Sequence, residues 1–320
     1  MQLEATALWH MTASHSSLDQ EMLLPAEAGT VLVESLYSLI STGTERLVAM
    51  ADVPASSYEK MGVPFMGGSL ALPVKYGYSL VGRIAEEGHP RVGETVHLLH
   101  PHQDRIRVPE SVLFQVPAKV PARRATLASN VETAVNAVWD SGVSIGDKVL
   151  VVGFGIIGSL LARVLSGIAG LDIFIAEKDP ARQKLIREMG WQIHEAEIDF
   201  DCAFHCSGNE SGLQLCIDAV GFEGKIVELS WYGEKAISLK LGSSFHHDRK
   251  QIISSQVSQL PTDRRGRWDY LRRKKIVFKL LNDPAFDHHL THEILFQDLP
   301  ETFDQIRNRQ QDALSWVVRY

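Results

Sequence analysis

The chain has 320 residues, of which 45% are hydrophobic and 22% are charged, with a formal net charge of −7 at pH 7. This length allows two domains and a sizeable core, and the composition is typical of a soluble globular protein. The negative charge argues against nucleic-acid or anionic-membrane partners, because phosphate binding needs accumulated Lys and Arg. No apolar run approaches the roughly 20 residues that cross a bilayer, and the N-terminus lacks the features of a signal peptide. We therefore expect a cytoplasmic protein.

The first 120 residues predict a small, mostly antiparallel β domain. Short apolar runs at 30–36, 78–84, 95–99 and 106–108 are separated by Gly, Pro and Ser, and long helical periodicity is scarce. From about Pro121 the pattern changes, because residues 123–139 place apolar side chains at helical spacing. A second domain is therefore expected to begin there.

A strand, a glycine turn and a helix follow one another at residues 147–168. Gly153 would make the turn, Gly155 would let a pyrophosphate approach the backbone, and Gly158 would let the helix pack on the strand. The helix N-terminus offers N–H groups and the positive end of a dipole to phosphates. A second strand ends at Glu177, where a carboxylate can accept hydrogen bonds from an adenosine ribose. The combination predicts a dinucleotide site rather than a ligand-free turn.

Strands and helices then alternate as far as residue 256, which predicts a parallel, doubly wound sheet with its ligand crevice at the carboxyl ends of the strands. Glu177 would repel a 2′-phosphate, so NAD is favoured, with NADP as the alternative because Lys178 and Arg182 lie nearby. Loop residues at two strand ends are expected to line the crevice, unless they are ordinary loop residues. The expected cofactor-binding residues are Gly153, Gly155, Ile157, Gly158, Glu177, Lys178, Arg182, Ser207, Gly208, Ser230 and Trp231.

The tail beyond about Leu260 is too short to form a domain. It contains a helical pattern at 269–281 and an alternating segment that ends near Val318. We expect it to return to the N-terminal domain, which gives a catalytic domain at 1–120 and 262–320 and a dinucleotide-binding domain at 121–261. A basic cluster within residues 264–275 is interpreted as a solvated helix face, or alternatively as an anion site for an acidic substrate or a 2′-phosphate.

Several separate stretches carry a family resemblance. Residues 73–82, PVKYGYSLVG, are similar to a Pro-Val-x-x-Gly-His-Glu-x-x-Gly strand, and Thr42-Gly43-Thr44-Glu45 lies where the same family has Cys-Gly-x-Asp. Together with 93–96 and Thr133-Ala134, they make the chain resemble the medium-chain dehydrogenase/reductase superfamily, the zinc alcohol dehydrogenase relatives. The resemblance implies an α/β fold with a Rossmann sheet and a GroES-like, mostly antiparallel β catalytic domain. It also implies a cofactor contact from Thr133 and a homodimer formed through the last Rossmann strand.

The departures from the family concern zinc. The positions of the catalytic zinc ligands correspond to Thr42, Tyr78 and Ser129, and none of these side chains belongs to the usual N/S ligand set. The four-cysteine loop of the structural zinc is missing, since the chain passes directly from Leu99 to Val108. A member without zinc is therefore predicted. Two short stretches, 40–46 and 77–83, resemble the bacteriochlorophyllide dehydrogenase branch.

Hydride transfer without a Lewis acid needs hydrogen-bond or proton donors at the carbonyl oxygen. The candidates are Tyr78, helped by Thr42 and Thr44, and a second group formed by His100 and His102, whose side chains titrate near neutral pH. Each could instead be a packed or surface residue. The predicted function is zinc-independent, NAD(P)-dependent interconversion of a small-molecule alcohol and a carbonyl. The alternatives are a quinone or enoyl reductase and a non-catalytic dinucleotide-binding protein.

Overall fold

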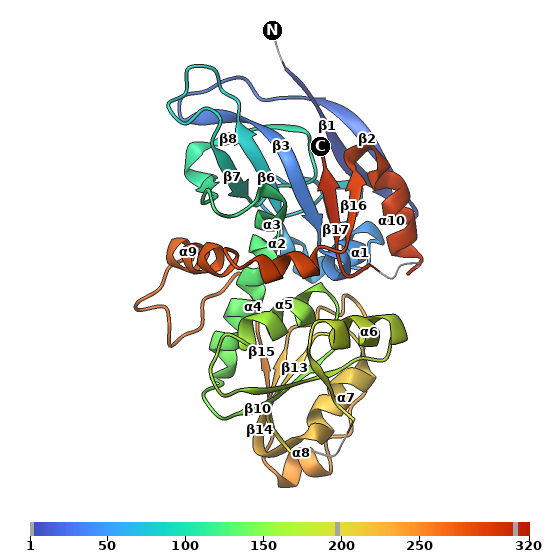
Figure 1. Ribbon diagram of the computed structural model, residues 1–320. Helices are drawn as coiled ribbons and strands as arrows, with labels where there is room; N and C mark the ends of the chain where they lie inside the picture. The colour runs from blue at the N-terminus through green and yellow to red at the C-terminus, as the bar shows by residue number, and fades with distance from the viewer. Residues whose placement is uncertain (1–2, 196–198, 310–312) are drawn as a thin grey trace. The chain divides into compact units, whose positions relative to one another are not determined.

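The computed structural model describes residues 3–195, 199–309 and 313–320 (Figure 1). The chain forms two compact units: unit 1 comprises the residues up to Ser129 together with Leu281–Tyr320, and unit 2 comprises Asn130–Leu280. Both junctions lie later in the chain than the domain boundaries at 120 and 261 that we expected.

The larger sheet of unit 1 has seven strands in the order β16-β17-β3-β6-β7-β9, with β8 paired to β3 outside this path. Its pairs are antiparallel apart from β16 with β17. One side is lined by buried aliphatic residues such as Val31, Leu80 and Val96. The strands are β3 (Thr30–Ile40), β6 (Leu80–Ile84), β7 (Thr95–Leu98), β8 (Arg105–Pro109), β9 (Phe114–Gln115), β16 (His292–Leu295) and β17 (Trp316–Arg319).

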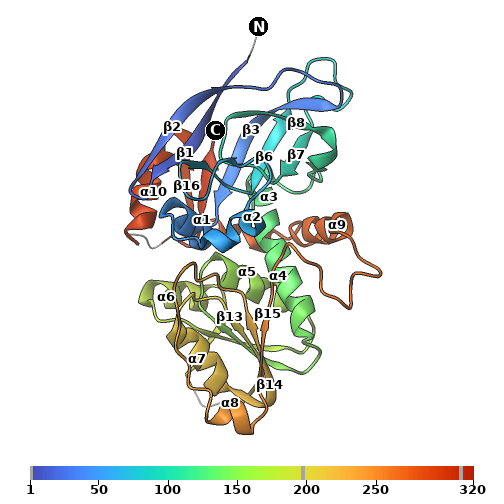
Figure 2. The same ribbon diagram turned by 180° about the vertical axis from the view of Figure 1, so that it is seen from behind.

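A second sheet of unit 1 has the order β2-β1-β5-β4. Helix α10 lies beside β2, and together with α1 it closes a core that contains Leu8, Ile40 and Phe303 (Figure 2). The strands are β1 (Glu4–Thr12), β2 (His15–Met22), β4 (Gly67–Gly68) and β5 (Val74–Lys75). The helices, including the short 3-10 turns η1 to η4, are α1 (Thr42–Ala49), η1 (Ala55–Ser57), α2 (Tyr58–Met61), η2 (Glu110–Val112), α3 (Ala122–Ala125), η3 (Pro284–His289), η4 (Phe296–Asp298) and α10 (Leu299–Arg307).

Unit 2 is a six-stranded, wholly parallel sheet in the order β12-β11-β10-β13-β14-β15. The chain order reverses between β10 and β13, and such a switch point is where open α/β sheets bind ligands. The strands are β10 (Lys148–Val152), β11 (Asp172–Ala176), β12 (Gln192–Ile193), β13 (Phe200–His205), β14 (Val220–Glu228) and β15 (Gln251–Ser254). The helices are α4 (Ala128–Ser141), α5 (Ile156–Leu165), α6 (Pro180–Glu188), α7 (Glu210–Ala219), α8 (Ser244–His247) and α9 (Tyr270–Leu280).

One local feature differs from the sequence-based expectation, which placed residues 262–320 with the N-terminal domain. Helix α9 belongs to unit 2 because Arg273 and Lys274 both form ion pairs with Glu132 on α4.

The tail of the chain enters the larger sheet of unit 1. Strand β17 pairs antiparallel with β3, so that Val317 lies opposite Leu39. Residues near both ends of the described chain therefore share one sheet. In the described residues, no helix has the length and apolar character needed to span a bilayer.

Candidate functional site

Three hydroxyl side chains gather at the start of helix α1 in unit 1. Ser41 is the residue that precedes the helix, Thr44 lies in its first turn, and Tyr78 lies just before β6. The phenol of Tyr78 forms hydrogen bonds with Ser41 and Thr44. Burial first, and then the Glu45 carboxylate, raise the pKa of Tyr78 to about 12, although the two hydroxyl hydrogen bonds oppose this rise. Tyr78 is therefore protonated at neutral pH and can donate a hydrogen bond.

Glu45 ties this cluster to the protein interior. Its Oε1 accepts the backbone N–H of Ser41, the N-cap residue of α1, at 2.7 Å. Its Oε2 lies 2.8 Å from Nε2 of His102, and Nδ1 of His102 lies 2.7 Å from Oγ of Ser38. Ser38 in turn contacts the Tyr320 hydroxyl at 3.0 Å. The start of α1 is thus fixed by a continuous buried hydrogen-bond chain.

The two histidines proposed for acid/base work lie in the interior of unit 1. Both ring nitrogens of His102 are engaged, one by Glu45 and one by Ser38. His100 stacks on Phe65 with ring centroids 5.2 Å apart, and its Nδ1 lies 2.9 Å from the Pro101 carbonyl oxygen. Burial lowers the pKa of His100 to about 3. This imidazole is therefore neutral in the pH range where a general acid/base catalyst titrates.

The positions that correspond to catalytic zinc ligands carry hydroxyl groups. Thr42 begins α1, Tyr78 belongs to the hydroxyl cluster, and Oγ of Ser129 donates to the Tyr78 carbonyl oxygen at 2.8 Å. Structural and catalytic zinc ions take Cys, His and carboxylate ligands. The described residues contain no group of three or more His, Cys, Asp or Glu that could hold a metal. The side chains at these positions therefore do not fit a zinc ion.

The glycine turn of unit 2 has the geometry that a dinucleotide site needs. Gly153 adopts a φ of +96°, which side chains rarely allow, and a Cβ on Gly158 would lie 1.9 Å from the Gly153 carbonyl oxygen. A Cβ on Gly155 would meet no atom within 4 Å, so the backbone is open there to an approaching phosphate. Helix α5 begins at the next residue, Ile156, with Ile157 and Gly158 in its first turn. The N–H groups of that turn are available in the way that pyrophosphate binding uses.

Glu177 follows β11 and is fixed beside this turn. Its carboxylate accepts backbone N–H groups from Phe154 at 2.8 Å, Lys178 at 2.7 Å and Asp179 at 3.0 Å. Nη1 of Arg182 lies 3.9 Å from the same carboxylate, whereas Nζ of Lys178 turns to the Ser211 hydroxyl at 2.8 Å. The acidic group, the glycine turn and the helix start together fit the adenosine half of a dinucleotide.

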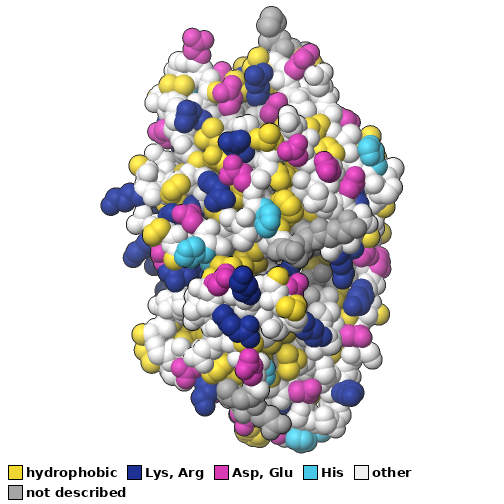
Figure 3. Space-filling view, turned by 45° about the vertical axis from the view of Figure 1, so that its right-hand side comes forward, with side chains coloured by type: hydrophobic (Ala, Val, Ile, Leu, Met, Phe, Trp, Pro, Cys, Tyr) yellow, Lys and Arg dark blue, Asp and Glu magenta, His cyan; other side chains and the backbone are white. Residues whose placement is uncertain are grey.

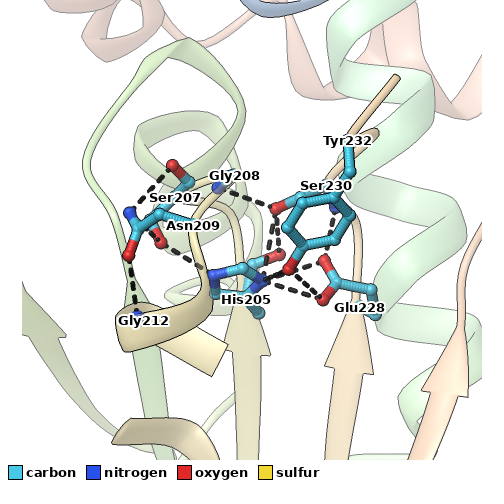
Figure 4. Close-up of polar contacts among 8 residues, drawn as sticks. All are labelled: His205, Ser207, Gly208, Asn209, Gly212, Glu228, Ser230 and Tyr232. Atoms are coloured by element: carbon cyan, nitrogen blue, oxygen red, sulfur yellow. Dashed lines mark hydrogen bonds and ion pairs between the residues drawn. The ribbon is translucent and has the colours of Figure 1, made fainter. Parts of the chain in front are cut away.

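The expected crevice residues lie at the carboxyl ends of two neighbouring strands. Ser207 and Gly208 follow β13, Ser230 and Trp231 follow β14, and the Gly208 N–H donates to Oγ of Ser230 at 3.0 Å (Figure 4). Thr133, the other expected contact, lies on α4.

Two residues that sequence reasoning missed stand directly beneath these loops. His205 and Glu228 are the last residues of β13 and β14 and are paired in register. Nδ1 of His205 lies 2.9 Å from both carboxylate oxygens of Glu228, and the hydroxyl of Tyr232 donates to Oε2 at 3.0 Å (Figure 4). The register of the two parallel strands is the signal that would have identified the pair.

The basic cluster at 264–275 is not one continuous solvated face. Arg273 and Lys274 are buried and both pair with Glu132, with Nε of Arg273 3.3 Å from Oε1. Arg272 instead lies over the ring of Trp268, with 3.9 Å from its guanidinium carbon to the ring centroid. Lys and Arg alternate with Asp and Glu over the face of the molecule drawn in Figure 3, without a single-sign patch.

Comparisons with known proteins agree with this geometry. No family model matches the chain. An uncharacterized zinc-type alcohol dehydrogenase-like protein of Escherichia coli, YphC, is 25% identical over 52% of this chain and 49% of its own length. The (R,R)-butanediol dehydrogenase of Bacillus subtilis is 30% identical over 39% of this chain and 40% of its own length. The chain thus spans half or less of these two curated relatives.

Solved structures match over the whole chain. The 2R,3R-butanediol dehydrogenase of Bacillus subtilis superposes with a TM-score of 0.78 at 19% identity, covering 99% of both chains. The chain therefore has the fold of this dehydrogenase. An alcohol dehydrogenase from Escherichia coli CFT073 complexed with NADH gives a TM-score of 0.75 at 15% identity, and a dehydrogenase from Sinorhizobium meliloti bound to NADP gives 0.77 at 15%, each covering at least 99% of both chains. The expected fold class, an α/β fold with a Rossmann sheet and a GroES-like domain, is confirmed.

Proposed function

We propose that this protein is an NAD(P)-dependent oxidoreductase of the medium-chain dehydrogenase/reductase superfamily, which interconverts an alcohol and a carbonyl without a catalytic zinc ion. The observation that carries this proposal is the hydroxyl cluster of Tyr78, Ser41 and Thr44, which occupies the region of the zinc-ligand positions. The resemblance to butanediol dehydrogenases supports the alcohol and carbonyl chemistry and suggests a small hydroxylated substrate.

The residues of unit 2 would hold the cofactor. The turn at Gly153, Gly155 and Gly158 would take the pyrophosphate, and Glu177 would accept hydrogen bonds from the adenosine ribose. When bound, a nicotinamide cofactor supplies or accepts the hydride. Because Glu177 would repel a 2′-phosphate, NAD is favoured over NADP, although Arg182 lies close enough to its carboxylate to weaken that repulsion.

The residues of unit 1 would serve the substrate oxygen. Tyr78 keeps its proton at neutral pH, so its hydroxyl can donate a hydrogen bond to a carbonyl oxygen and stabilise the charge that develops there. Ser41 and Thr44 orient the phenol, and the Glu45–His102 pair holds the start of α1 in place. We assign Thr42, His100 and His102 to shaping and supporting this site.

A homodimer formed through β15 belongs to the same proposal. Among the residues that the structure describes, this strand is the last of the parallel sheet and pairs with β14 alone, so its other edge carries main-chain groups that a second copy can pair. The side chains of Gln251, Ile252 and Ser254 on it are exposed.

The test uses purified protein whose metal content has been measured, before and after dialysis against a chelator. NADH and NADPH are titrated by fluorescence, and turnover is followed with acetoin and 2,3-butanediol. We expect micromolar binding of NADH and turnover that chelation leaves unchanged. Activity that chelation abolishes and zinc restores would disprove zinc independence, and reduction of quinones but not of ketones would favour the other reductase class. Absence of binding to either dinucleotide would overturn the oxidoreductase assignment itself.

A further inference from the structure

The hydrogen bonds around His205 engage both ring nitrogens. The Glu228 carboxylate accepts the Ser230 N–H at 2.7 Å and the Tyr232 hydroxyl, and it lies 2.9 Å from Nδ1 of His205. Because an ionised carboxylate only accepts, Nδ1 of His205 donates to it. The other ring nitrogen, Nε2, lies 2.7 Å from the Ser207 hydroxyl oxygen and shares a hydrogen bond with it.

The same hydroxyl has a second partner. Nδ2 of Asn209 donates to Oγ of Ser207 at 3.0 Å, so the hydroxyl is hydrogen-bonded on two sides. A Cβ on Gly212 would lie 2.1 Å from this oxygen, so helix α7 closes that side (Figure 4). The order Glu228, His205, Ser207 is that of a charge-relay triad, but a hydroxyl packed and bonded in this way has no room for an acyl group. The arrangement holds a loop in position.

That loop forms one wall of the glycine turn. A Cβ on Gly153 would lie 2.8 Å from Cα of Ser207, so the two backbones touch at the switch point between β10 and β13. The imidazole itself is fully buried, and the Tyr232 ring lies nearly parallel to it, with centroids 6.2 Å apart and planes 19° apart.

We propose that His205 is a positioning residue of the dinucleotide site, which holds Ser207 against the Gly153 turn while Glu228 and Tyr232 hold the imidazole. This inference rests on the proposed function. It states that the His205–Glu228 pair increases the affinity of unit 2 for its cofactor. Loss of the hydrogen bond between His205 and Ser207 should free the 207–209 loop. Dinucleotide binding should then weaken, whereas substrate binding should not change.

Two substitutions separate the two sides of the ring. His205→Gln places an amide near the position of Nε2 and keeps the contact with Ser207, whereas His205→Asn places it near Nδ1 and keeps only the contact with Glu228. We expect the Kd for NADH to rise at least tenfold in His205→Asn and less than threefold in His205→Gln. At saturating dinucleotide, kcat stays within about twofold of wild type in both, which a general loss of structure would not produce.

His194→Asn is the matched control, because His194 also belongs to unit 2 and packs edge-on against Phe200 outside the cluster. Its Kd for NADH should equal that of wild type. Ser207→Ala removes the same hydrogen bond without altering the histidine, and it replaces His205→Asn if that variant does not fold. An unchanged Kd in both His205→Asn and Ser207→Ala would overturn the proposal.

Hydrogen exchange of the unliganded proteins keeps this inference separate from the proposed function. Peptides that cover 152–159 and 206–212 should exchange faster in His205→Asn than in wild type or His205→Gln. If wild type binds neither dinucleotide, the proposed function fails, and the exchange result alone then decides whether His205 positions the loop. Equal exchange in all three proteins would show that it does not.

Discussion

Glu45 and His102 form a fully buried acid–imidazole pair, 2.8 Å apart and 57 residues apart in sequence. The carboxylate also accepts the Ser41 N–H, so Glu45→Gln weakens two contacts at once. We expect this variant to lose about 1–3 kcal/mol of unfolding free energy, measured by urea titration. Glu59→Gln on the exposed side of α2 is the control and should change stability by less than about 0.5 kcal/mol. Equal stability of the two variants would show that the pair contributes nothing.

Tyr78→Phe tests the proton donor. Removal of one preorganised donor from a developing oxyanion typically costs about 10²–10³-fold in kcat, so a fall of about 10²-fold is expected, with the Kd for NADH unchanged. Tyr37→Phe, a half-buried tyrosine of β3 in the same unit, should retain full activity. Because the pKa of Tyr78 is raised to about 12, the wild-type rate should show no tyrosine ionisation near pH 10. Full activity in Tyr78→Phe would remove the residue from the mechanism.

Glu177→Ala tests the cofactor preference. The substitution removes the acceptor for a ribose hydroxyl and the acceptor of the Phe154 N–H, and it removes the carboxylate that pairs with the Arg182 guanidinium. NADH binding should weaken about tenfold, whereas NADPH binding should hold or improve, so that the ratio of the two Kd values moves towards NADPH. Competitive fluorescence titrations measure this ratio. If the ratio of the two Kd values equals that of wild type, Glu177 does not discriminate between NADH and NADPH at the ribose.

Glu132 is the shared partner of two buried cations. Glu132→Gln would remove the carboxylate that pairs with both Arg273 and Lys274, and breaking a buried pair typically costs about 3–5 kcal/mol. The pKa of Lys274 is already lowered by burial, and loss of the carboxylate should lower it further. The comparison is Glu223→Gln, because Glu223 pairs with Arg249 on the exposed surface of the same unit, where less than about 1 kcal/mol is expected. Urea unfolding of both variants measures the difference.

Stability should fall as the pH is lowered from neutrality. Burial, with a further contribution from Arg307 and His102, lowers the pKa of His10 to about 3, and burial lowers that of His100 to about 3. Between pH 6.5 and 3 these two histidines bind protons in the unfolded chain but not in the folded chain. Each of them therefore lowers the free energy of unfolding by up to about 1.4 kcal/mol for each unit by which the pH falls. In His10→Asn the unfolding free energy should depend less steeply on pH, by the amount that the binding of one proton contributes. His292→Asn changes an exposed side chain and should leave this dependence as it is. An unchanged slope in His10→Asn would contradict the buried neutral state.

Local spacing was enough to predict the dinucleotide half of the molecule. The glycine turn and the acidic residue at the end of the next strand lie within about thirty residues of each other, and the alternation of strand with helix continues as far as residue 256. The α/β class followed from them, whereas the family resemblance rested on separate stretches such as residues 73–82 and 42–45. The strand ends at Ser207 and Ser230 were also placed correctly, because apolar runs define where strands stop.

Contacts made by distant residues could not be predicted in this way. His102 reads as a titratable loop residue, and only the fold buries it between Glu45 and Ser38. The sequence likewise suggests that Arg273 and Lys274 are solvated, whereas in the fold they pair with Glu132 of α4. Strand β2 has the sequence HSSLDQEM, which lacks the alternation of apolar and polar residues that predicts a half-buried strand. It forms a strand because it pairs with β1.

The pairing of β17 with β3 has a consequence for biosynthesis. Tyr37 to Ile40 emerge from the ribosome more than two hundred residues before Trp316 to Arg319, which cover their edge. Until then this part of β3 has open main-chain groups on one side and can pair wrongly with another nascent chain. The parallel sheet of Asn130–Leu280 is continuous in sequence and is completed earlier. We therefore expect the chain to complete its dinucleotide unit first during translation, and to complete the larger sheet of unit 1 only after Trp316 to Arg319 have been made.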